Sequence, residues 1–128
     1  MRKKLLFFIS ILFLLFSLLA CSTMNQVEKD FNKYGYEVKI INDDYNDDFN
    51  ATEALENIYG VYDSKDLLVA RLYEFSSSGA LDKFIEDAGG EFPGTLRNKE
   101  LLMFSEVGDY AVLTLIFFGH DPNEFLNR

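Results

Sequence analysis

Apolar residues recur with two different periods in the first half of the chain, and each period predicts a different element. Over 24–34 they return every three or four positions, which predicts a helix. Over 36–40 they alternate with polar residues, which predicts a half-buried strand. Asn50 and Glu53 then form a helix-capping pattern, so we expect a short helix over 51–58.

The middle of the chain predicts a hairpin followed by a helix. Two apolar segments rich in strand-forming residues, 59–62 and 67–75, flank the polar residues 63–66. This arrangement is typical of two strands joined by a four-residue loop. A helix is expected over 80–88, because its apolar residues fall on one face and two glycines follow it.

The last third of the chain predicts an edge strand, a second hairpin and a terminal helix. Residues 91–97 contain a proline, so they form an edge strand at most. The second hairpin joins 101–105 to 110–118, and its last strand is apolar on both faces, as a covered central strand would be. Pro122 follows a capping Asp121 and starts a short helix.

Helices and antiparallel hairpins alternate along this order of elements. We therefore expect an α+β fold, in which an antiparallel sheet packs with two to four short helices. A ferredoxin-like arrangement is the first candidate within that class. The 128-residue chain shows no repeats or internal linkers, so one domain is expected.

The first 20 residues do not fit this pattern and predict a secretory signal peptide. A basic head, Met1-Arg2-Lys3-Lys4, precedes a run from 5 to 20 that is apolar except for two serines. The run is 16 residues long, whereas a membrane-spanning helix needs about 20. A basic head, a short apolar run and a small residue at the boundary together indicate a leader that is removed.

The boundary itself, Leu18-Leu19-Ala20-Cys21, resembles the lipobox of bacterial lipoproteins. The resemblance implies that Cys21 receives a diacylglycerol, that the chain is cut just before it, and that the protein is held to the cell membrane. An uncleaved membrane anchor and an ordinary secreted protein with a free thiol are the alternatives.

Cleavage there would divide the chain into a signal peptide, 1–20, and an acidic domain, 21–128. Residues 21–34 are expected to be the membrane-proximal helix or tether. Thr23 and Gln26 form a capping-box pattern at its start.

Net charge and cysteine content exclude several functions. The whole chain has a net charge of −9, from 12 basic and 21 acidic residues. Three of the basic residues lie in the leader, so residues 21–128 hold nine basic and 21 acidic residues, a net charge of −12. Nucleic-acid binding needs clustered Lys and Arg, so no nucleic-acid partner is expected. A single Cys excludes an internal disulfide and a cysteine-rich zinc site.

The acidic segment 42–53 is the best candidate for ligand chemistry, because it resembles an EF-hand calcium loop. It departs from that pattern with Asn42 at the first position, Asp47 where the loop needs glycine, and a strand instead of a helix before it. A metal is therefore not favoured. The oxygen-bearing candidates are Asn42, Asp44, Asn46, Asp48, Asn50 and Glu53.

Catalytic patterns are weak. His120 is the only histidine and directly precedes the capping Asp121. Ser76, Ser77 and Ser78 stand before a predicted helix, where serine is expected as a cap. No glycine-rich phosphate loop is present. We do not expect an enzyme or a cofactor other than the covalent lipid.

These observations predict a small bacterial surface lipoprotein, anchored to the cell membrane and facing away from the cytoplasm. It would act as a non-catalytic binding module for an extracytoplasmic protein or another envelope component. One alternative is an inhibitor or exclusion factor against a cationic enzyme or a phage. The other is a calcium-binding module built on residues 42–53.

Overall fold

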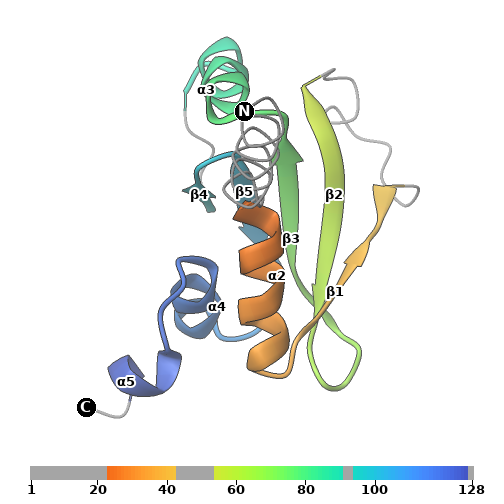
Figure 1. The fold of residues 1–128 in the computed structure, drawn as a ribbon, viewed down its shortest axis with the longest axis vertical. Helices are drawn as coiled ribbons and strands as arrows, with labels where there is room; N and C mark the ends of the chain where they lie inside the picture. The colour runs from red at the N-terminus through yellow and green to blue at the C-terminus, as the bar shows by residue number, and fades with distance from the viewer. Residues whose placement is uncertain (1–22, 43–53, 91–93, 127–128) are drawn as a thin grey trace, which may run out of the picture.

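A computed structural model describes residues 23–42, 54–90 and 94–126 of the chain. A five-stranded sheet forms the centre, with helices packed around it (Figure 1). The elements, in chain order, are α2 (Thr23–Lys33), β1 (Glu37–Ile40), β2 (Leu55–Tyr62), β3 (Leu68–Phe75), α3 (Ser78–Asp87), β4 (Thr95–Asn98), β5 (Leu101–Ser105), α4 (Tyr110–Phe117) and α5 (Pro122–Leu126).

The strands run in the order β1-β2-β3-β5-β4, and every neighbouring pair is antiparallel. This architecture confirms the predicted α+β class. The ferredoxin-like candidate within that class does not match, because that arrangement is built from the order β-α-β-β-α-β. Here three consecutive strands follow α2, and two helices end the described chain.

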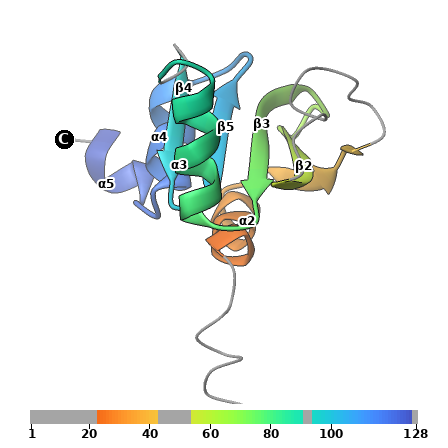
Figure 2. The ribbon, with the colours of Figure 1, turned by 90° about the horizontal axis from the view of Figure 1, so that it is seen from above.

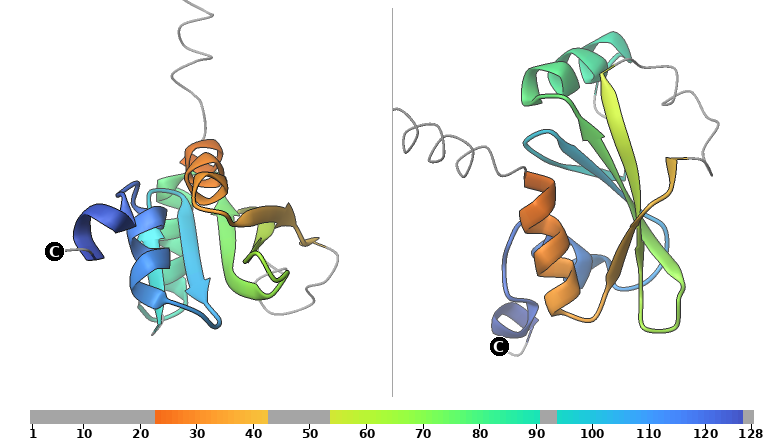
Figure 3. Two further views of the ribbon diagram at one scale, coloured as in Figure 1. Left: turned by 90° about the horizontal axis from the view of Figure 1, so that it is seen from below. Right: turned by 45° about the vertical axis from the view of Figure 1, so that its right-hand side comes forward.

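One face of the sheet is covered by α2 and α4, which lie next to each other (Figure 3). Apolar residues three or four positions apart in each helix pack onto alternate residues of the strands. Seen along the strands, α2 lies against one side of the sheet (Figure 2). The helical part of this core is formed by Met24, Val27, Phe31, Leu113, Ile116 and Phe117.

A second, smaller core lies on the opposite face, beneath α3. Leu81 of α3 is fully buried there, and Phe84 stacks at a tilt on Phe75 with ring centroids 5.1 Å apart. The sheet residues of this core include Ile58 and Tyr73, which face each other across β2 and β3. The predicted helix over 80–88 is therefore confirmed, with α3 beginning two residues earlier.

The helix predicted over 51–58 is wrong, because its last residues belong to β2. Leu55 pairs with Phe75, and Ile58 pairs with Tyr73, in the antiparallel register of a hairpin. Residues 51–53 lie outside the described residues. The loop expected at 63–66 joins β2 and β3 as predicted.

The strand predicted over 110–118 is also wrong, because these residues form α4. Asp109 caps this helix, and its carboxylate accepts hydrogen bonds from the amides of Ala111 and Val112 at 3.1 and 3.3 Å. The apolar residues fit a helix in which Leu113, Ile116 and Phe117 are buried on one side. The covered central strand is instead β3, which lies between β2 and β5.

The other predicted elements are confirmed, with local differences. The capping box at the start of α2 is wrong in its contacts, because Gln26 donates a hydrogen bond to Asp30 at 3.1 Å. β1 begins one residue later than predicted, and it is less buried than expected, because Ile40 is 61% exposed. β4 lies at the edge of the sheet, and Pro122 begins α5. Among the described helices, none has the length and apolar character needed to cross a bilayer.

Candidate functional site

The first described residue, Thr23, begins α2 and is two positions after Cys21 in the sequence. The Thr23 amide donates a hydrogen bond to the Glu100 carboxylate at 3.2 Å, so the turn between β4 and β5 holds the start of α2. The predicted lipidation residue Cys21 and its lipobox neighbours Leu18, Leu19 and Ala20 lie outside the described residues. Their roles stay predictions.

An open groove of about 760 Å³ runs along the outer side of α2. Asn98 and Lys99 form one wall, and the end of α4 forms the other. The Asn98 side-chain amide donates to the Phe117 carbonyl at 2.8 Å, which joins β4 to the end of α4.

The groove is lined mainly by polar groups that can form hydrogen bonds. Its lining mixes amides and opposite charges, including Glu28, Lys29, Asp30 and Lys99, with one exposed aromatic ring, Phe118. No serine, cysteine or histidine is among the lining residues. The groove can therefore hold a polar ligand, but its lining offers no nucleophile paired with a histidine.

Asn42, the first position of the calcium-loop pattern, has a structural role. Its side-chain oxygen accepts the amide of the buried Ile58 at 2.6 Å, and its nitrogen donates to Asn57 at 3.1 Å. These bonds fasten the end of β1 to β2. The other calcium candidates, Asp44, Asn46, Asp48, Asn50 and Glu53, lie outside the described residues. Calcium binding stays a prediction, and no group of three or more acidic, histidine or cysteine ligands occurs in 23–42, 54–90 and 94–126.

A buried carboxylate continues this polar network across the sheet. Glu74 is 8% exposed, and its Oε1 atom accepts from the Asn57 side chain at 3.0 Å and from the Tyr59 hydroxyl at 3.1 Å. Burial, followed by the nearby Glu74 carboxylate, raises the pKa of Tyr59 to about 12. The Tyr59 hydroxyl therefore remains a hydrogen-bond donor at physiological pH.

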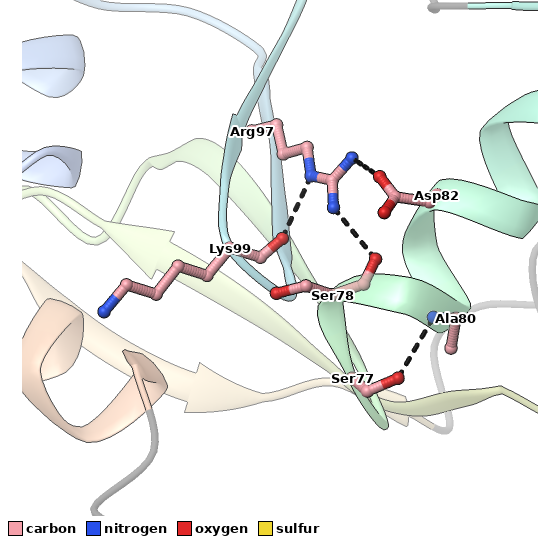
Figure 4. Close-up of polar contacts among 6 residues, drawn as sticks. All are labelled: Ser77, Ser78, Ala80, Asp82, Arg97 and Lys99. Carbon is pink, nitrogen blue, oxygen red and sulfur yellow. Dashed lines mark hydrogen bonds and ion pairs between the residues drawn. The ribbon is translucent and has the colours of Figure 1, made fainter.

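Ser77 caps α3, as expected, and its side chain accepts the Ala80 amide at 3.0 Å (Figure 4). Beside it, Arg97 joins α3 to the β4–β5 hairpin. The guanidinium donates to the Ser78 carbonyl at 2.9 Å and to the Lys99 carbonyl at 3.0 Å, and it pairs with Asp82. This contact set orders the fold and does not activate a serine.

His120 lies at the surface, between α4 and α5. Its ring contacts Phe125 edge-on, with centroids 5.4 Å apart, and its amide donates to the Leu115 carbonyl at 2.8 Å. The Asp121 carboxylate accepts the Asn123 amide at 2.9 Å, which confirms the predicted cap of α5. His120 and Ser77 belong to different elements with separate contacts.

Sequence reasoning missed a group of exposed apolar residues in and beside the turns that precede β3 and follow β5. Leu67, Val107 and Tyr110 are 53%, 49% and 50% exposed. We call the region formed by 63–67 and 106–110 the distal tip. Leu67 directly follows a polar turn, and Val107 lies within another. Turns are usually polar, so an apolar residue at such a position is the sequence signal that could have revealed the distal tip.

Comparison with family models, with curated proteins and with solved structures finds no match to this chain. Its function is therefore argued from the residues and their arrangement.

Proposed function

We propose that this protein is a lipid-anchored, non-catalytic binding module on the extracytoplasmic side of a bacterial cell membrane. The observation that carries the proposal is the burial of Met24 in the main core, only three positions after Cys21 in the sequence. Two residues of extended chain span about 7 Å at most, so a lipid on Cys21 would hold the first turn of α2 close to the bilayer.

The start of α2 is well suited to such a connection. Met24, Val27 and Phe31 are all buried, so the helix belongs to the main core. Its first amide is bonded to Glu100, 77 residues further along the chain. A domain attached in this way would keep one end near the membrane and direct the other end away from it.

The contacts of Ser77 and His120 support binding in preference to catalysis. Ser77 is engaged as a helix cap, and His120 packs on Phe125. The groove beside α2 is lined by groups that form hydrogen bonds and ion pairs. We propose a protein or another envelope component as the partner.

An inhibitor of a cationic enzyme is the second candidate function. It is favoured by the net charge of −12 on residues 21–128 and by the exposed apolar side chains of the distal tip. An acidic surface attracts a cationic partner over several ångströms, and exposed apolar groups add affinity once contact is made.

The anchor is tested by replacing Cys21 with serine in the full-length chain. Wild-type protein should sediment with membranes, incorporate labelled fatty acid and become accessible to protease in cells with the wall removed. Cys21→Ser should lose the label and leave the membrane fraction. Ser22→Ala, the matched control at the next position, should behave like the wild type. Retention of Cys21→Ser in washed membranes would show that the lipid anchor is wrong.

A further inference from the structure

We infer that the distal tip is a docking surface for a cationic protein that presents apolar side chains. This inference rests on the proposed binding function and deepens it, because it names the surface and the chemistry of the partner.

Two loops far apart in the sequence are fastened together at the tip. The Val69 carbonyl accepts the amide of Glu106 at 2.8 Å and the amide of Val107 at 3.3 Å. Gly108 lies against the Val69 side chain, so closely that an added Cβ would come within 3.4 Å of it. The loop after β5 is therefore anchored beside the start of β3. Leu67 and Val107 are presented from neighbouring backbone segments.

The 63–67 loop is also held by its own hydrogen bonds. The Asp63 carboxylate accepts the amides of Lys65 and Leu67 at 2.9 and 3.0 Å. Asp66 has a left-handed backbone, with φ of 62°. A loop fixed in this way loses little conformational entropy on binding, so its exposed leucine is preorganised for contact.

Single exposed apolar side chains are normal. Here Leu67 and Val107 lie in two fastened loops and Tyr110 begins the helix that follows, so three such residues come from adjoining segments. Leu67, Val107 and Tyr110 are each about half exposed, whereas the apolar residues of the core are almost fully buried. Aromatic and aliphatic anchors at the centre of a polar rim are the usual composition of a protein-binding surface.

The rim of the tip is acidic overall. Its carboxylates are Glu37, Asp63, Asp66, Glu106 and Asp109, and its basic side chains are Lys39, Lys65 and Arg71. Lys39 lies 3.6 Å from Asp66 and 3.7 Å from Glu37, and Arg71 pairs with Glu106. Two carboxylates from separate loops, Asp109 and Asp63, also lie close enough to raise the pKa of Tyr36, after burial as the larger cause.

This charge favours a cationic protein over a membrane as the occupant. Anionic lipid headgroups would be repelled by the rim and by the −12 domain behind it. The tip is also remote from the lipid attachment point. The turn between β2 and β3 lies near the last turn of α2 (Figure 1), and this helix has 11 residues, is about 16 Å long and begins at Thr23.

Site-specific photocrosslinking in native membranes tests whether a partner occupies the tip. A benzophenone side chain is placed at Leu67 or Val107 of the full-length chain. The matched control is placed at Phe125 on α5, which is 47% exposed. We expect both tip positions to give the same adduct with a basic protein, and Phe125 to give none. About 1 M NaCl should reduce the yield, because the Debye length falls to about 3 Å.

A direct binding measurement removes the need to identify that protein. The probe is a helical peptide of leucine and lysine, added to the full-length lipidated protein in discs of zwitterionic lipid. The double variant Leu67→Ser, Val107→Ser should bind it at least about tenfold more weakly, as expected when central apolar contacts are lost. The control pair Ile40→Ser, Phe125→Ser, with similar exposure, should bind like the wild type.

Several results would overturn the inference. In the peptide measurement, they are an unchanged affinity of the tip variant, or an equal affinity for a peptide with glutamine in place of lysine. In the photocrosslinking experiment, they are the absence of crosslinks at the tip, or crosslinks formed only to lipid, to an acidic protein or to a second copy of this chain. The peptide measurement does not depend on lipidation. Failure of the Cys21→Ser test would therefore remove the anchor but leave the docking surface in place.

Discussion

At the residue scale, Glu74 shows how this domain accommodates a buried charge. Burying a carboxylate is unfavourable unless hydrogen bonds replace its lost hydration. Asn57 and Tyr59 both donate to the same carboxylate oxygen, and Asn42 supports Asn57 in turn. Asn57 and Tyr59 belong to β2, Glu74 belongs to β3, and Asn42 lies two residues after β1. The network therefore joins β2 to β3 and to the segment that follows β1.

Tyr59 should make the stability of the domain sensitive to alkaline pH. Its pKa is raised from 10.0 to about 12 in the folded protein, so the folded state retains this proton when the unfolded state has lost it. The stabilisation is complete below pH 10 and is lost as pH rises toward about 12. Denaturant titrations across this range should show a steeper decline for the wild type than for Tyr59→Phe.

The same substitution should lower the free energy of unfolding at neutral pH by about 1 kcal/mol, because the Glu74 hydrogen bond is lost. Tyr110→Phe, at a half-exposed ring, controls for the loss of one tyrosine hydroxyl. Parallel curves for wild type and Tyr59→Phe between pH 10 and about 12 would contradict the assignment.

Lys99 should show a stabilising effect of glycine. It occupies the two-residue turn between β4 and β5 with a left-handed φ of 56°, a conformation that disfavours side chains with a Cβ. Lys99→Gly should raise the free energy of unfolding by up to about 1 kcal/mol. The carbonyl that accepts from Arg97 is retained.

The matched substitution is Lys83→Gly, at an exposed position inside α3. It should lower the free energy of unfolding by about 1 kcal/mol, because glycine is unfavourable within a helix. Urea denaturation of both variants compares the signs directly. A decrease of similar size for Lys99→Gly would mean that the left-handed turn carries no strain.

At the element scale, the segments 51–58 and 110–118 show where sequence patterns were insufficient. An apolar run without a clear period suits a buried strand and a buried helix equally well. Over 110–118 the helix prevails because Asp109 caps it and its apolar residues can pack against α2. Over 55–58 the strand prevails because these residues pair with the end of β3, Leu55 with Phe75 and Ile58 with Tyr73. This pairing outweighs the helix-capping pattern of Asn50 and Glu53.

The elements that were predicted correctly have local sequence signals of their own. The hairpin of β2 and β3 has a polar four-residue turn, and α3 has a serine cap and terminal glycines. By contrast, the groove beside α2 and the distal tip join segments far apart in the chain. No local pattern contains those contacts, because they depend on the packing of α4 and on the order of the strands.

The cap of α4 provides a direct test of this helix. Asp109→Ala should lower the free energy of unfolding by about 1 kcal/mol, because two amides of the first turn lose their acceptor. Asp109→Asn keeps an acceptor oxygen and should be nearly neutral, and thermal unfolding followed by circular dichroism measures both. Equal effects of the two variants would assign the stability to the charge of Asp109 instead of to the cap.

At the scale of the whole molecule, the two proposed functional regions lie at different places on the described domain. The first turn of α2 and the β4–β5 turn would lie near the membrane if Cys21 carries a lipid. The distal tip lies near the last turn of α2, where the loops before β3 and after β5 meet. The uneven distribution of charge fits this arrangement, because the basic residues of the predicted signal peptide precede the strongly acidic residues 21–128.

The packing of α2 against residues from the last third of the chain has a consequence for biosynthesis. The neighbours of α2 include the Glu100 carboxylate and the apolar side of α4, so its binding site is complete only when about nine-tenths of the sequence has been made. A chain that emerges from its N-terminus would lack those partners during most of its synthesis. If the predicted signal peptide directs export, α2 would therefore dock only after most of the chain has reached the far side of the membrane.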